Sequence, residues 1–168
     1  MRSIRRWLGF NERPRGQERA YDLNDVQRSV EEGRRLAIYD RGTRLYAYWY
    51  LALRGQEELE RARRYRRQLS MVSIWASDPA SIGRVARMLE GGLRPSDLAG
   101  YLNNGHFVVL LIETDALGAS IVLDRLSRQI GRGVEAAVVS YPHDAETFDA
   151  LLELAKSKVL PDDGRRSA

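Results

Sequence analysis

Residues 94–113 read RPSDLAGYLNNGHFVVLLIE, and this stretch decides the fold class. Two apolar runs, residues 98–102 and 107–113, lie on either side of Asn103-Asn104-Gly105. Asparagine and glycine tolerate the positive φ angles that a tight turn needs, so the pattern predicts a β-hairpin.

The segments on either side of this hairpin alternate in type. Turn residues and apolar periodicity predict, in chain order, a strand over 69–76, a helix over 80–93, the two hairpin strands, a helix over 116–130, a strand over 134–141 and a helix over 145–159 that Asp144 caps. The β-α-β-β-α-β order predicts an α+β fold (an α/β sandwich) of the ferredoxin-like plan, an antiparallel sheet with its helices on one face. For the helix over 116–130, the residues expected to point inward are Leu117, Ile121, Leu123, Leu126 and Ile130.

Further helices are expected before the first strand. Residues 21–37 carry apolar residues at helical spacing, with Asp22 or Asn24 placed to cap the first turn. A second helix is expected over 45–68, with one apolar side formed by Leu45, Trp49, Ala52, Leu53, Leu59, Ala62 and Tyr65. The aromatic cluster Tyr46, Tyr48, Trp49 and Tyr50 at its start is interpreted as core or helix-pairing surface rather than as a platform for stacked bases.

The chain of 168 residues, 43% of them apolar, is long enough for a single core. We expect a basic flexible arm over 1–20, one domain with an N-terminal helix over 21–160, and a polar tail over 161–168. The absence of cysteine excludes disulfides and thiolate metal sites, and no residue pattern indicates a cofactor, a metal or a catalytic group. No long apolar span or secretory signal is visible, so a cytoplasmic protein is expected.

The net charge of +4 comes from the arm, which carries Arg2, Arg5, Arg6, Arg13, Arg15 and Arg19. Two interpretations of the arm stay open, a frayed terminus or a peripheral contact with a membrane surface or polyanion. The basic run over 61–67 is interpreted as a solvated face with ion pairs, so nucleic acid is not an expected partner. His106 and His143 lie in predicted loops without a neighbouring nucleophile pattern, and both are expected to be solvated.

Several stretches resemble GGDEF domains, the diguanylate cyclases that join two GTP molecules into cyclic di-GMP. Residues 36–46, LAIYDRGTRLY, are similar to the family's D-x-L-T-G-L-Y opening, and residues 58–70, ELERARRYRRQLS, to the arginine-rich helix before its first strand. Residues 94–107 are similar, register for register, to the family run R-x-S-D-L-x-x-R-x-G-G-D-E-F. Tyr141-Pro142 and the helix after it match the family's end, so the resemblance covers about residues 36–158 and implies the family's fold.

The same comparison implies that the catalytic groups are gone. The family holds two magnesium ions on carboxylates at the end of the first strand and in the signature turn. Here these positions are Ile74-Trp75-Ala76-Ser77 and Asn103-Asn104-Gly105-His106-Phe107, while Asp78 comes one position late. Residues 78–93 also lack the family's F-K-x-x-N-D-x-x-G-H pattern, and Ala47-Tyr48 replaces its N-R pair. We therefore expect a degenerate GGDEF domain that is not an enzyme.

One ligand motif of the family has a counterpart here. Arg94-x-x-Asp97 stands where the family's product-inhibition site lies, and the resemblance implies cyclic di-GMP as its ligand. An arginine can fork onto guanine or phosphate, and an aspartate can accept from the guanine edge. The alternative interpretation involves no ligand: Asp97 caps a turn and Arg94 is a solvated arginine. If the motif does bind a ligand, Arg87 or Arg125 are further arginines that could complete the site.

The function expected is that of a catalytically inactive signalling module of bacterial type. It is either a cyclic di-GMP receptor through Arg94 and Asp97, or an adaptor that binds a protein partner or a second copy of itself and no nucleotide. A binder of polyanions or membrane surfaces through residues 1–20 is the third alternative.

Overall fold

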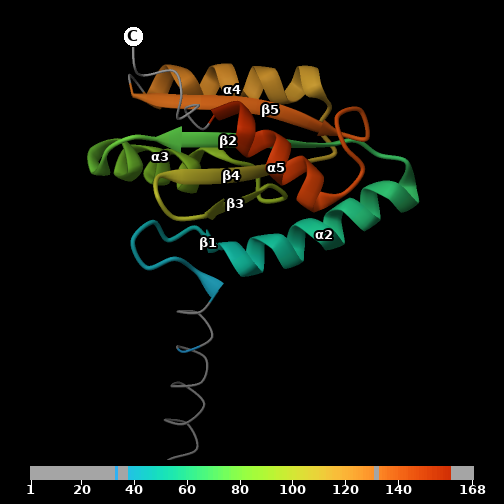
Figure 1. The fold of residues 1–168 in the computed structure, drawn as a ribbon, viewed down its shortest axis with the longest axis horizontal. Helices are drawn as coiled ribbons and strands as arrows, with labels where there is room; N and C mark the ends of the chain where they lie inside the picture. The colour runs from blue at the N-terminus through green and yellow to red at the C-terminus, as the bar shows by residue number, and fades with distance from the viewer. Residues whose placement is uncertain (1–32, 34–37, 131–132, 160–168) are drawn as a thin grey trace, which may run out of the picture.

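The computed structural model describes residues 33, 38–130 and 133–159. The predicted arm, all but one residue of the helix expected over 21–37, and the predicted tail lie outside the described residues. The elements are β1 Tyr46–Ala47, α2 Tyr48–Tyr65, β2 Leu69–Ala76, α3 Pro79–Gly92, β3 Leu98–Tyr101, β4 His106–Ile112, α4 Ala116–Ile130, β5 Val134–Tyr141 and α5 Phe148–Val159 (Figure 1). None of the described helices is both long and apolar enough to cross a bilayer.

The five strands form one sheet in the order β1-β3-β4-β2-β5. β2 pairs antiparallel with both β4 and β5, and β3 pairs antiparallel with β4 across the hairpin. The α+β class and the β-α-β-β-α-β order are thus confirmed. The short β1 was not predicted: it pairs in parallel with β3, which makes the sheet mixed and delays the helix expected from Leu45 until Tyr48.

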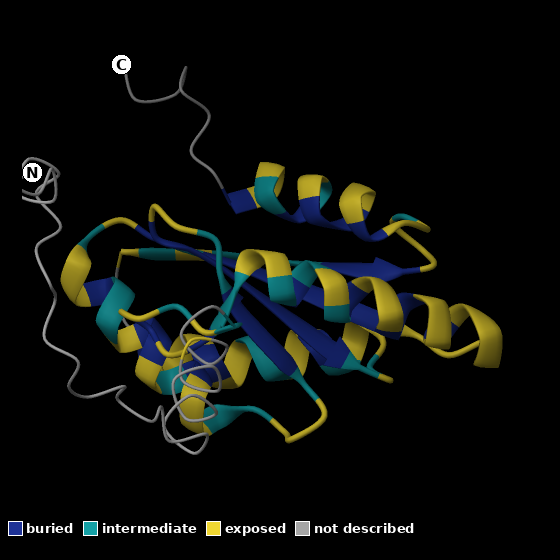
Figure 2. Cartoon of the chain, turned by 90° about the horizontal axis from the view of Figure 1, so that it is seen from below, coloured by how far each residue is buried: buried dark blue, intermediate teal, exposed yellow. Residues whose placement is uncertain are grey.

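Helices cover both faces of the sheet: the two helices of the β-α-β-β-α-β unit share one face, as predicted, and the extra helices α2 and α5 cover the other. On one face, α3 and α4 pack on alternate residues of β2 and β4, among them Val72, Ile74 and Val109. On the other face, α2 and α5 pack on the intervening residues, such as Met71 and Leu110, and α5 crosses in front of the sheet in Figure 1. The physical reason is that β2 and β4 each carry apolar residues on both sides of the sheet, which leaves neither face suited to water. Figure 2 shows the result as buried strands between helices whose outer sides are exposed.

Two helices, α2 and α4, bury a different face from the one that the sequence predicted. In α2 the buried residues include Leu51, Leu59 and Ala62, whereas Trp49, Leu53 and Tyr65 are 48–60% exposed. In α4 the buried residues are Ala119, Leu126 and Ile130, and the expected core residues Leu117 and Ile121 are exposed at 72% and 63%.

The start of α5 was also misplaced. Thr147, not Asp144, caps this helix, because its Oγ1 accepts from the Ala150 N–H at 3.2 Å. Asp144 instead accepts from the Ser140 N–H at 2.7 Å and closes the turn after β5. That backbone hydrogen bond is the main reason that the pKa of Asp144 is lowered.

Candidate functional site

The hairpin turn between β3 and β4 has a tightly fixed backbone. Asn103, Asn104 and Gly105 have φ angles of 79°, 50° and 78°. The His106 N–H donates to the Asn103 carbonyl at 3.0 Å, and the Gly105 N–H donates to the Tyr101 hydroxyl at 3.2 Å. The turn predicted from the sequence is present, with both asparagines in the left-handed region that they tolerate better than most residues.

A pocket of about 370 Å³ lies beside this turn, and we call it the hairpin pocket. Its walls combine two aromatic rings, two amides, an imidazole, two leucines and one ammonium group. The lining residues are Tyr48, Trp75, Leu102, Asn103, Asn104, His106, Leu152 and Lys156. Residues from α2, β2, the hairpin and α5 therefore converge at this end of the sheet.

His106 does not lie in a solvated loop, and that prediction was wrong. It is the first residue of β4, pairs in register with Trp75 of β2, and is 5% exposed. Its Nε2 lies 2.5 Å from the Ser73 Oγ. Burial, and then the positive charge of Lys156, lowers the pKa of His106 to about 4, so that the ring is neutral at pH 7. His143, in contrast, is exposed as expected, with its side chain 89% accessible.

The end of β2 carries no carboxylate where the resemblance implies a metal ligand. Trp75 lines the hairpin pocket, and Ala76 donates its N–H to the Gly105 carbonyl at 2.9 Å. Asp78 is the N-cap of α3, accepting from the Ser81 N–H at 3.0 Å and from the Ser81 Oγ at 2.6 Å. The Ser81 hydroxyl and N–H lower the pKa of Asp78. Within residues 38–130 and 133–159 no group of three acidic or histidine side chains could hold a metal ion.

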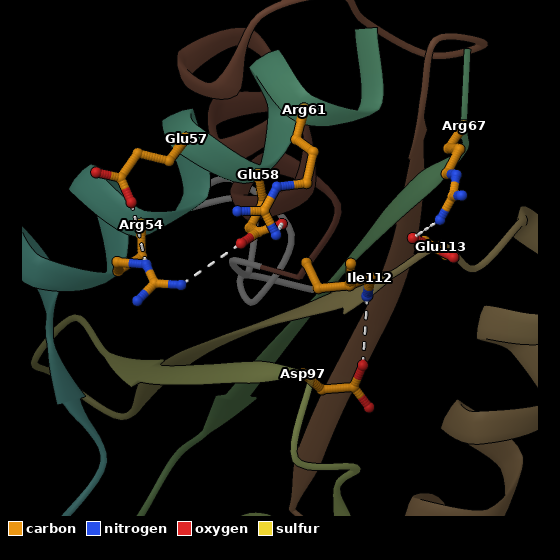
Figure 3. Close-up of polar contacts among 8 residues, drawn as sticks. All are labelled: Arg54, Glu57, Glu58, Arg61, Arg67, Asp97, Ile112 and Glu113. Carbon is orange, nitrogen blue, oxygen red and sulfur yellow. Dashed lines mark hydrogen bonds and ion pairs between the residues drawn. The ribbon is translucent and has the colours of Figure 1, made fainter. Parts of the chain in front are cut away.

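Asp97 lies between the loop after α3 and the end of β4. Its Oδ2 accepts from the Arg94 N–H at 3.2 Å, and its Oδ1 accepts from the Ile112 N–H at 3.3 Å. Figure 3 shows the contact that joins Asp97 to Ile112. The turn-capping role that the sequence allowed for Asp97 is thus present in the structure, and it fixes the backbone from which the Arg94 side chain projects.

Arg94 lines a second pocket, of about 560 Å³, that we call the arginine pocket. Its lining residues are Arg67, Gln68, Arg94, Glu113, Thr114, Asp115 and Gly118. Neither Arg87 nor Arg125 is among them, and the Arg125 Nη2 donates to the Gly92 carbonyl at 2.8 Å. The second arginine is instead Arg67, which forms an ion pair with Glu113 (Figure 3). In the sequence, Arg67 could be recognised only as a member of a basic run. Its position two residues before β2 does not show that it lies beside the loop after α3, because that proximity depends on the folded sheet.

Two further arginines of that basic run form ion pairs along the helix, as the sequence predicted. Arg61 pairs with Glu58 at 3.3 Å, and Arg63 pairs with Glu60 at 2.9 Å, each at helical spacing. Glu58 is only 6% exposed and also contacts Arg54 at 3.4 Å, as Figure 3 shows. Carboxylates along α2 thus offset the positive charge of its arginines.

No protein-family model matches the sequence, and no curated protein matches it. Among solved structures, a sensory box/GGDEF family protein from Caulobacter crescentus is 21% identical, with 73% of this chain and 96% of that one covered and a TM-score of 0.65. The coiled coil and GGDEF domain of DgcB from the same organism, in complex with c-di-GMP, is 13% identical over 80% of this chain and 85% of that one, with a TM-score of 0.69. Diguanylate cyclase SiaD from Pseudomonas aeruginosa, in complex with its activator SiaC, is 22% identical. The match covers 81% of this chain and 62% of that one, with a TM-score of 0.64.

The fold is therefore that of GGDEF domains. The hairpin that decided the fold class from the sequence corresponds to the family's signature turn in the resemblance, and here it forms one wall of the hairpin pocket.

Proposed function

We propose that this chain is a signalling module with the GGDEF fold that makes no cyclic di-GMP and binds it at the arginine pocket. The observation that carries the proposal is that Arg67 and Arg94, far apart in the sequence, line one pocket next to the loop that Asp97 fixes. Guanidinium groups fork onto phosphate oxygens and onto guanine O6 and N7, which are the groups that a cyclic guanine dinucleotide presents.

The contacts that Arg67 and Asp97 already make are compatible with a ligand. Arg67 and Glu113 are about half exposed, with side-chain exposures of 53% and 52%, so their ion pair is weak and can be exchanged for a phosphate contact. Each Asp97 oxygen already accepts one backbone N–H, and a carboxylate oxygen has a second lone pair. The size of the arginine pocket falls in the range of small-molecule sites.

The proposal that the module is not an enzyme is supported by the residues at the hairpin end of the sheet. A two-metal phosphoryl transfer needs hard oxygen ligands that hold the ions and offset the charge of its transition state. Trp75 and Ala76 occupy the end of β2, and Asp78 is engaged in capping α3. The neighbours in complex with c-di-GMP support a ligand of this class.

The alternative is an adaptor that binds a protein and no nucleotide. Leu117 and Ile121, one helical turn apart on α4, are exposed at 72% and 63%, which is typical of a contact surface when such residues adjoin one another. SiaD, in complex with its activator, supports a protein partner for a domain of this fold. Binding through the basic arm stays a prediction from the sequence, because residues 1–20 lie outside the described residues.

Calorimetric titration of the full chain with cyclic di-GMP tests the receptor proposal. We expect saturable binding that Arg94→Ala weakens by about tenfold or more and that Arg67→Ala also weakens, because each removes charge-assisted hydrogen bonds. Arg87→Ala is the matched control: this exposed arginine does not line the pocket, and its loss leaves the affinity unchanged. Absence of binding to the wild-type chain, or equal binding by Arg94→Ala, contradicts the receptor proposal and favours the adaptor.

A further inference from the structure

The hairpin pocket has a chemistry of its own that the proposed cyclic di-GMP site does not use. It shares no lining residue with the arginine pocket. Trp75 from β2 and Tyr48 from α2 supply flat aromatic surfaces, and Asn103 and Asn104 supply amide donors and acceptors. Lys156 from α5 supplies an ammonium group.

The charge in this pocket matches a ligand with one negative group. Among the residues that the structure describes, Lys156 is the only cationic side chain that lines it, and none of those lining residues is an arginine or a carboxylate. The Lys156 Nζ also contacts the Glu153 Oε1 at 2.9 Å, but Glu153 is 71% exposed, and such a surface pair is easily exchanged. A nucleoside triphosphate would bring several negative charges without enough cations to offset them, so the lining favours a monoanion.

Backbone hydrogen bonds fix the wall of the pocket that the hairpin turn forms. Leu102 donates its N–H to the His106 carbonyl at 2.8 Å, and the turn is further tied to β2 through the Ala76 N–H and the Gly105 carbonyl. His106 is buried and engaged with Ser73. Because the backbone around the two asparagines is fixed, little conformational entropy is lost when a ligand binds.

We propose that the hairpin pocket binds a small aromatic carboxylate, whose ring lies against Trp75 and whose carboxylate accepts from Lys156. The pocket volume of about 370 Å³ lies in the range of small-molecule sites. The lowered pKa of His106, to which the charge of Lys156 contributes, agrees with an ammonium group close to the buried ring. Nothing in this binding requires a divalent cation.

The test uses 2-naphthoate as the probe and the full chain labelled with ¹⁵N. The chain has three tryptophans and therefore three indole N–H signals. The spectra of Trp7→Phe and Trp49→Phe each lack one of them, and the signal present in both belongs to Trp75. We expect 2-naphthoate to shift this signal saturably in the absence of a divalent cation. Two matched probes separate the contributions: 2-naphthylmethanol has the ring without the charge, and acetate has the charge without the ring, so both bind at least about tenfold more weakly.

Variants of α5 locate the charge. Lys156→Gln weakens 2-naphthoate about tenfold, Lys156→Arg retains most of the affinity, and Lys158→Gln changes nothing, because Lys158 contacts the Val138 carbonyl and does not line the pocket. Arg94→Ala leaves this binding intact, which keeps the result independent of the cyclic di-GMP proposal. The inference is overturned by the lack of a saturable Trp75 shift, by equal affinities for the naphthoate and the alcohol, by an unchanged affinity in Lys156→Gln, or by displacement at lower concentration by GTP with Mg²⁺.

Discussion

At the scale of single residues, the imidazole of His106 occupies a position where a positive charge is costly. It is 5% exposed, and the positive charge of Lys156 on α5 acts on it. The sequence placed this histidine beside a turn, which usually means solvent. The structure differs because the hairpin folds back on the end of β2, and the pairing of His106 with Trp75 carries the ring into the sheet.

The buried neutral state of His106 makes stability depend on pH. Its pKa is about 4 in the folded chain against an ordinary value of 6.5, so as the pH falls through this window the unfolded chain takes up a proton that the folded chain does not. The free energy of unfolding therefore falls, by up to about 3 kcal/mol between pH 6.5 and pH 4. Urea unfolding of wild type and His106→Asn at pH 7 and pH 4.5 measures this, with a smaller fall expected in the variant.

His143→Asn is the control for that experiment. This histidine is 89% exposed in the turn after β5, so its replacement removes the other imidazole of the chain without opening the buried surroundings of His106. A His106→Asn variant that loses as much stability as wild type between the two pH values would show that another group is responsible.

Gly105 is the residue of the turn that only glycine can occupy. Its φ is +78°, and a Cβ there would lie 2.0 Å from the Ala76 carbonyl oxygen, a backbone atom that β-pairing holds in place. We predict that Gly105→Ala lowers the free energy of unfolding by about 3 kcal/mol or more, as measured by chemical denaturation.

Asn104→Gly is the matched substitution in the same turn. Asn104 has a φ of 50°, and glycine adopts this region without strain, so the variant stays within about 1 kcal/mol of wild type. Equal stability of Gly105→Ala and Asn104→Gly would contradict the geometry described for the turn.

At the scale of elements, the sequence predicted the types and bounds of most helices and strands but not always the faces they bury. The strands over 69–76 and 134–141 and the helix over 116–130 have the predicted bounds. The buried side of α2 was predicted wrongly because its large apolar side chains Trp49, Leu53 and Tyr65 were expected to face the core, whereas they are exposed. The side that meets the sheet instead carries the small residues Gly55 and Ala62, which allow α2 to approach α5 and β4 closely.

Gly55 provides a direct test of that close approach. A Cβ at this position would lie 2.3 Å from the Phe148 Cε2 and 2.8 Å from the Leu110 Cδ1. Overpacking of a core contact typically costs 1 to 3 kcal/mol, so we predict that Gly55→Ala is destabilised by about 2 kcal/mol despite the better helix propensity of alanine. Thermal or urea unfolding measures the change.

Two further variants decide whether the contact is the cause. Gly83→Ala, inside α3, has ordinary contact space and gains up to about 1 kcal/mol from helix propensity. Phe148→Leu combined with Gly55→Ala recovers part of the loss relative to the sum of the single changes. A Gly55→Ala variant as stable as Gly83→Ala would contradict the packing of α2 on α5.

At the scale of the whole molecule, the structure has the GGDEF fold, and the replacement of the groups expected for GTP chemistry stays a prediction from the sequence. The sequence could predict the fold because the landmarks of the resemblance are local runs of residues. It could not predict the two pockets, since each gathers residues from separate elements: Arg67 meets Arg94, and Lys156 meets Asn103, only after the sheet has formed.

The two pockets lead to different expectations for ligands. The arginine pocket presents two guanidinium groups, beside the carboxylates of Glu113 and Asp115, and guanidinium groups are suited to phosphate. The hairpin pocket presents the ammonium group of Lys156 and two aromatic rings. Under the two proposals, this domain binds small molecules at two places, and neither binding event needs a metal ion or a chemical step.

The account is tested most directly by incubating the purified full chain with GTP and Mg²⁺ or Mn²⁺ and measuring products chromatographically, beside an active diguanylate cyclase under the same conditions. The account predicts no cyclic di-GMP and no metal-dependent loss of GTP, because Trp75, Gly105 and His106 occupy positions that the resemblance assigns to metal-binding carboxylates. Accumulation of cyclic di-GMP that depends on the metal ion would contradict it.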